Sequence, residues 1–157
     1  MEDPILELKN LSIDYPINIG TVRAVRNIDL ELHKGEALGL VGESGCGKST
    51  LGLSILNMVR PPGLISSGEV LFKGKDLLKL GNRGINKVRG NGIAMVFQNP
   101  LTSLNPLFRI DDHFLETIQR HEPHISKRDA LERAENILDA LGIEKKRLYE
   151  YPHQLSG

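Results

Sequence analysis

Residues 42–50 read Gly42-Glu43-Ser44-Gly45-Cys46-Gly47-Lys48-Ser49-Thr50, and they are the most informative segment of the chain. It matches G-x-x-x-x-G-K-[ST], the pattern of a loop that binds phosphate groups through its backbone N–H donors. The apolar residues 36–41 before it predict a buried parallel strand, and residues 51–56 after it predict a helix. This order of strand, loop and helix indicates the phosphate loop of an α/β nucleotide-binding domain.

The residue types of the loop explain how it would bind a polyphosphate. Glycines allow tight bends, and the start of the following helix adds a partial positive charge. Lys48 is predicted to reach the β- and γ-phosphates, and the Ser49 hydroxyl to bind Mg²⁺. The expected nucleotide-binding residues of the loop are Gly42, Glu43, Ser44, Gly45, Cys46 (through its N–H group), Gly47, Lys48, Ser49 and Thr50, the last of which supports the helix start.

The composition excludes several classes of protein. The chain has 157 residues, a hydrophobic share of 39%, zero formal net charge and one cysteine. This length suits one domain or part of a larger one. Zero net charge gives no case for nucleic acid, and one cysteine excludes an internal disulfide framework. Residues 1–4 lack the pattern of a signal peptide, and no apolar run could cross a bilayer, so membrane contact is expected only through a partner.

Strands are expected on both sides of the loop. Residues 5–15, with a bulge near Asn10 and an end at Tyr15-Pro16, and residues 22–32 predict antiparallel strands of an edge layer. Beyond the loop helix, residues 69–72 predict a strand and Asp76 caps a short helix that ends near Gly81. Residues 82–92 predict a surface loop, and residues 93–97 predict a buried strand that leads to Gln98.

The pattern changes after Gln98. Residues 99–106 contain two prolines, which excludes a long regular element. Helices are expected at 110–121 and 127–141; Ser126 caps the second, Gly142 ends it, and its apolar face holds Leu131, Ala134, Leu138 and Leu141. We therefore expect a nucleotide-binding α/β core over residues 1–98 and a helical subdomain over residues 99–157.

The motifs together resemble an ATP-binding cassette (ABC) ATPase. The phosphate loop, Val96-Phe97-Gln98 and the ending Tyr151-Pro152-His153-Gln154-Leu155-Ser156-Gly157 carry the resemblance, and Asn99-Pro100-Leu101-Thr102-Ser103-Leu104-Asn105-Pro106 is similar to the ATPase subunits of dipeptide and oligopeptide importers. The resemblance implies a P-loop NTPase core with an antiparallel β edge layer and a helical subdomain, the C-terminal part of the fold being absent. It also implies ATP and Mg²⁺ as cofactors.

The family assigns further roles to this sequence. Tyr15 would stack on adenine, and Gln98 would contact Mg²⁺ and the attacking water, which makes Lys48 and Gln98 the expected catalytic residues. Ser156 and Gly157 would begin the signature that reaches the ATP of a second ATPase subunit. The implied partners are that second subunit, transmembrane permease subunits that contact residues 99–110 and, indirectly, an extracytoplasmic solute-binding protein, and the implied location is the cytoplasmic face of the membrane.

The family's Mg²⁺-positioning aspartate, general-base glutamate and switch histidine follow the signature, so residues 1–157 hold none of them. The resemblance therefore implies a fragment that binds ATP at best, with an exposed edge beside residues 36–41. The alternative is a nucleotide-binding or assembly fragment without turnover. A GTPase is disfavoured because Asp139-Ala140-Leu141-Gly142 falls on a helix and Asn86-Lys87-Val88-Arg89 lacks the final aspartate. A small-molecule kinase lacks its arginine-rich lid, and His121 and His124 lack a third metal ligand.

Overall fold

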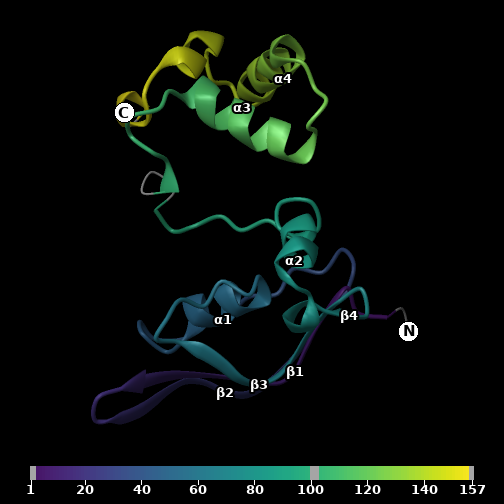
Figure 1. Cartoon of the computed structure of the whole chain (residues 1–157), viewed down its shortest axis with the longest axis vertical. Helices are drawn as coiled ribbons and strands as arrows, with labels where there is room; N and C mark the ends of the chain where they lie inside the picture. The colour runs from purple at the N-terminus through teal and green to yellow at the C-terminus, as the bar shows by residue number, and fades with distance from the viewer. Residues whose placement is uncertain (1–2, 100–102, 156–157) are drawn as a thin grey trace. The chain divides into compact units, whose positions relative to one another are not determined.

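The computed structural model describes residues 3–99 and 103–155. The chain divides into two compact units, Met1–Ala94 and Met95–Gly157 (Figure 1). The boundary predicted near residue 98 lies close to this division, while the roles assigned to its two sides stay predictions. Within the described residues, every helix is too short or too polar to cross a membrane.

A four-stranded antiparallel sheet forms the base of the first unit. Its strands are β1 (Leu6–Ile17), β2 (Gly20–Leu32), β3 (Leu64–Phe72) and β4 (Lys75–Asp76), in the order β2-β1-β3-β4. The predicted pair of antiparallel strands before the loop is confirmed. The predicted bulge is confirmed as well, because the pairing of β1 with β2 shifts between Leu8 and Leu11 and Asn10 has a φ of 47°. The predicted end at Tyr15-Pro16 is one residue short, since β1 continues to Ile17.

The core of the first unit lies between this sheet and α1 (Lys48–Ile55), which covers one face of the strands (Figure 1). Leu8, Leu11 and Ile13 of β1 and Val70 of β3 are at most 1% exposed. Leu51 of α1 packs into the same cluster. Each buried aliphatic side chain of this kind stabilises the fold by about 1.5–3 kcal/mol, so the sheet provides the support on which the phosphate-loop helix rests.

Residues 82–92 do not form the predicted surface loop. The 3-10 helix η1 (Leu77–Lys79) is followed by α2 (Asn82–Val88). Glycine and basic residues suggested a loop, but Ile85 is only 2% exposed and belongs to the core cluster. Burial of this one side chain outweighs the weak helix propensity of Gly84. The short helix predicted at Asp76 is confirmed, because the Asp76 carboxylate accepts from the Leu78 N–H at 3.0 Å.

The strands predicted at residues 36–41 and 93–97 are not formed in the described part of the chain. Val41 is 97% exposed and Val96 is 89% exposed, and Ile93 makes only an isolated bridge to Arg89. A parallel strand is held by hydrogen-bonded neighbours and by layers over both faces. The four-stranded sheet pairs with neither segment, so apolar sequence alone does not make them strands.

The second unit is helical. It contains α3 (Ile110–His121), α4 (Lys127–Ala140), η3 (Lys145–Tyr149) and η4 (Pro152–Gln154). Both predicted long helices are confirmed, as are the cap at Ser126, whose hydroxyl accepts from the Asp129 N–H at 3.1 Å, and the left-handed Gly142, with a φ of 71°. Leu141 is 69% exposed, so its predicted core position is wrong. The buried side chains of α4 are those of Ala130, Ala134 and Leu138.

A glycine at the bulge of the sheet should be essential for stability. Gly68 has a φ of 96°, and a Cβ there would lie 2.5 Å from the Leu11 Cα. Gly74 also has a positive φ, 72°, but a Cβ there would meet nothing within 4 Å. We predict that Gly68→Ala lowers the free energy of unfolding by more than about 2 kcal/mol and Gly74→Ala by about 1 kcal/mol. Urea denaturation measures both, and equal losses would contradict the role of the bulge.

The Asp76 carboxylate should give the first unit a pH-dependent contribution to stability. Partial burial alone would raise the pKa of Asp76, but hydrogen bonds from Lys79 and Leu78 and the Lys79 charge hold this pKa below its ordinary value. The contribution is therefore present at neutral pH and is lost as the pH falls below about 4 and through the native pKa. We expect Asp76→Asn, which keeps a capping oxygen, to be less stable than wild type at pH 7, with a gap that closes towards pH 3 in urea titrations. A constant gap would contradict this.

Candidate functional site

The candidate site is the turn that leads from residues 42–46 into α1. Gly45 has a φ of 83° and Gly47, the N-cap of α1, has a φ of 96°. Side chains disfavour this left-handed region, so these two positions need glycine. The Leu51 N–H donates to the Gly47 carbonyl at 2.8 Å and closes the first helical turn. Since the first N–H groups of a helix have no partner within it, the end of α1 at Lys48 is suited to binding an anion.

The loop lies directly against β2. A Cβ added at Gly47 would stand 2.3 Å from the Ala24 carbonyl oxygen, and a Cβ at Gly42 would stand 2.7 Å from the Cys46 Sγ. Real Cβ atoms do not approach other atoms so closely, which means that the missing side chains create the room for this packing. The sequence pattern predicted the bends of the loop, but it did not predict the contact with β2.

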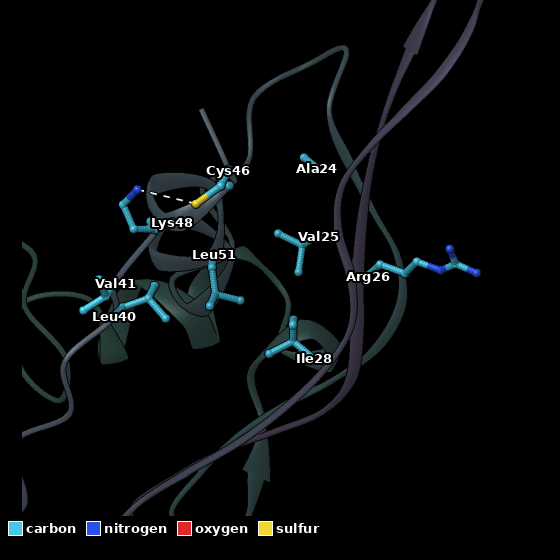
Figure 2. Close-up of a pocket in the computed structure, with 10 residues that line it drawn as sticks. Ala24, Val25, Arg26, Ile28, Leu40, Val41, Cys46, Lys48 and Leu51 are labelled. Carbon is cyan, nitrogen blue, oxygen red and sulfur yellow. Dashed lines mark hydrogen bonds between the residues drawn. The ribbon is translucent and has the colours of Figure 1, made fainter. Parts of the chain in front are cut away.

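Lys48 folds back over the loop. Its Nζ donates to the Gly42 carbonyl at 2.7 Å and to the Glu43 carbonyl at 2.6 Å. Figure 2 shows the third contact of this Nζ, which lies 3.5 Å from the Cys46 Sγ. An ammonium group has three donors and no acceptor. Two of these donors are therefore taken by loop carbonyls, and the ammonium lies against the loop.

An apolar pocket of about 240 Å³ adjoins the loop. Figure 2 shows Val25 and Ile28 of β2 facing Leu51 of α1, whereas Arg26 points away to the other side of β2. The sequence analysis did not predict that β2 lines this pocket, because the phosphate-loop motif carries no information about the residues of β2. The pocket is lined by Ala24, Val25, Arg26, Ile28, Leu40, Val41, Cys46, Gly47, Lys48 and Leu51.

Ser49 and Thr50 fall in the first turn of α1, as predicted, and Ser49 is exposed. No three His, Cys, Asp or Glu side chains in the described ranges 3–99 and 103–155 gather closely enough to hold a metal ion. A magnesium ion at the loop would therefore depend on the Ser49 hydroxyl, on phosphate oxygens of the ligand and on groups from outside the loop. Such an oxygen set is the kind that Mg²⁺ prefers.

The remaining predicted site residues are Tyr15, Gln98, Ser156 and Gly157. Tyr15 is half-buried, packs against the main core and approaches Gly63, where a Cβ would lie 2.5 Å from the Tyr15 Cε1; it does not line the pocket. Gln98 is exposed and belongs to the second unit. Ser156 and Gly157 lie outside the described residues. Their predicted roles all stay predictions.

Comparison with known proteins identifies relatives of the whole chain. Residues 25–157 match the family described as ABC transporter. The chain is 40% identical to the dipeptide transport ATP-binding protein DppD of Lactococcus lactis subsp. cremoris (strain MG1363), an alignment that covers 99% of this chain and 45% of the relative. It is 42% identical to the oligopeptide transport ATP-binding protein OppD of Bacillus subtilis (strain 168), covering 98% of this chain and 43% of the relative. The chain thus spans less than half the length of these curated relatives.

Solved structures share the fold. The dimeric structure of MJ0796, a bacterial ABC transporter cassette, superposes with a TM-score of 0.83 at 26% sequence identity, covering 97% of this chain and 63% of that one. A post-hydrolysis form of the MJ0796 cassette with ADP and Pi gives a TM-score of 0.79, also at 26% identity, covering 96% and 63%. The predicted fold class, a P-loop core with an antiparallel layer and a helical subdomain, is confirmed by this likeness.

The close packing of Gly47 on β2 gives a sharp test of the site. We predict that Gly47→Ala displaces the loop from Ala24 and weakens the binding of Mg-ATP at least about tenfold, because the clash is with backbone. Gly45→Ala is the matched control: its φ is 83°, but a Cβ there meets nothing within 4 Å. Titration calorimetry should show a smaller loss for Gly45→Ala. Equal losses would mean that backbone conformation alone, without the contact to β2, sets the binding geometry.

Proposed function

The chain belongs to the ABC transporter family, and we propose that it carries the ATP-binding part of the ATPase of a peptide importer. The observation that carries the proposal is the loop itself, in which two left-handed glycines, the start of α1 and the Lys48 ammonium converge. The names of the relatives DppD and OppD support dipeptides or oligopeptides as the cargo.

ATP would bind by exchanging partners at Lys48. The ammonium would leave the carbonyls of Gly42 and Glu43 and donate to the β- and γ-phosphate oxygens. The N–H groups at the start of α1 would hold the phosphates from the other side. Tyr15 would offer its ring to adenine, which suits a site with weak base selectivity because every base has a π-face.

Magnesium would be held by the Ser49 hydroxyl and the Gln98 amide oxygen. The exposed Ser49 in the first turn of α1 fits this role, and an amide oxygen is a suitable further ligand. The ion neutralises charge on the β- and γ-phosphates when it is bound. Gln98 follows directly on residues 93–97, so its position depends on how that segment is fixed.

The proposed setting is a transporter at the cytoplasmic face of the membrane. Ser156 and Gly157 would contact the ATP that is bound to a second ATPase subunit. Permease subunits would contact residues 99–110. The dimeric form of the MJ0796 cassette supports the first of these partners. A solute-binding protein would take part only through the permease.

ATP binding without turnover is the activity that we propose for residues 1–157. The glutamate that serves as general base in the family has no counterpart in this stretch, so Lys48 and Gln98 would take part in hydrolysis only together with groups outside it. The competing proposal is a nucleotide-binding module that serves assembly alone. The two differ in one property: an ATPase part should discriminate ATP from ADP through the γ-phosphate contact of Lys48.

The proposal is tested by calorimetric titration of the chain with Mg-ATP. We expect binding by the wild type and a loss of at least about tenfold in Lys48→Ala, because a hydrogen bond to a charged group contributes about 1.5–3 kcal/mol. Lys34→Ala, an exposed lysine in the turn before the loop, is the matched control and should bind like wild type. GTP should compete no better than ATP.

Three results would contradict the proposal. Absence of binding by wild type would remove the ATP-binding function from this stretch. Equal affinity of wild type and Lys48→Ala would place the nucleotide elsewhere. Steady hydrolysis of Mg-ATP that disappears in Lys48→Ala would show that the chain does more than bind.

A further inference from the structure

Arg89, the residue after α2, is hydrogen-bonded to the end of α1 that lies away from the phosphate loop. Its Nε donates to the Leu56 carbonyl at 3.0 Å, and its Nη2 donates to the carbonyls of Leu56 and Asn57, each at 2.8 Å. Its Nη1 donates to the Asn86 Oδ1 at 3.2 Å. The guanidinium thus ties α2 to the last backbone groups of α1, and all these residues belong to the first unit.

These carbonyls need an outside partner. The last carbonyls of a helix have no N–H group within it to accept from. The N–H groups of Asn57 and Met58 donate to earlier carbonyls, at 2.9 and 2.8 Å, and the last turn of α1 holds no basic residue. Leu56 is only 4% exposed, whereas Asn57 is exposed, so water competes less for the Leu56 carbonyl than for that of Asn57. Arg89 therefore supplies from another element both the donors and the positive charge that the end of a helix favours.

We infer that Arg89 is a positioning residue for nucleotide binding. The helix α1 has eight residues, and so short a helix is marginal unless its ends are held. By fixing the carbonyl end, Arg89 keeps the two turns of α1 formed, and with them the N–H groups and the Lys48 ammonium at the phosphate end. The inference rests on the proposed ATP binding at this loop and adds a residue that touches neither loop nor ligand.

The shape of the side chain explains why arginine stands at this position. A guanidinium presents several donors in a rigid plane and reaches two neighbouring carbonyls at once, whereas an ammonium is a point charge on a flexible stem. Arg89→Lys keeps the charge and some of the donors. It should therefore restore part of what Arg89→Ala removes.

The affinity test uses Mg-ATP titrations of the full chain at a temperature where circular dichroism shows every variant folded. We expect Arg89→Ala to raise the Kd about 3- to 10-fold and Arg89→Lys to recover at least half of that loss on a logarithmic scale. Arg83→Ala removes the same charge from an exposed position of α2 and should leave the Kd within about twofold. Gly74→Ala, which strains the turn between β3 and β4, controls for lower stability and should also leave the Kd unchanged.

A second readout needs no nucleotide. Hydrogen exchange followed by mass spectrometry should show faster exchange in Arg89→Ala over residues 48–58, with β1 and β3 unaffected, and slower exchange again in Arg89→Lys. Unchanged exchange over residues 48–58 would overturn the inference. An unchanged Kd in Arg89→Ala, or an equal rise in Arg83→Ala, would overturn it as well. Failure of the wild type itself to bind would instead overturn the proposed function, so the two failures can be told apart.

Discussion

The close approach of the loop to β2 is the constraint on which the rest of the first unit depends. Gly47 has no side chain, so the Ala24 carbonyl oxygen can lie close to its Cα. A Cβ added at Gly47 would be only 2.3 Å from that oxygen. This contact fixes where α1 begins and in which direction it runs. Leu51, one turn later, then enters the core formed by β1 and β3. The loop geometry and the hydrophobic core therefore support each other, and a change in one is felt in the other.

The two ends of α1 are treated differently. At the start, the Lys48 ammonium donates to two loop carbonyls, and the first turn carries no acidic residue to neutralise the N–H groups there. At the other end, Arg89 satisfies two carbonyls and supplies a positive charge. A helix dipole amounts to about half an elementary charge at each end. With its negative end already compensated, α1 offers its positive end to an anion.

Sequence reasoning succeeded where local chemistry decides the structure. The bulge in β1, the cap at Asp76 and the helices of the second unit follow from alternation, capping and periodicity within a few residues. It failed where distant partners decide. Residues 36–41 and 93–97 are apolar enough for strands, yet the sheet pairs with neither. Conversely, α2 forms from an unpromising sequence because Ile85 is buried. The site divides in the same way. The motif predicts the loop, but it marks neither Val25 and Ile28, which line the adjoining pocket from β2, nor Arg89, which is hydrogen-bonded to the far end of α1.

The position of Lys48 explains why such distant support matters for binding. Its ammonium already donates to the carbonyls of Gly42 and Glu43. A phosphate ligand would therefore replace these hydrogen bonds and would not add to them. The net gain from such an exchange is small compared with the strength of each bond. The affinity then depends on the conformational entropy that the loop and α1 lose on binding, and it is higher when they are already ordered. A loop fixed by Gly47 on one side, and a short helix fixed by Arg89 on the other, leave little to be ordered.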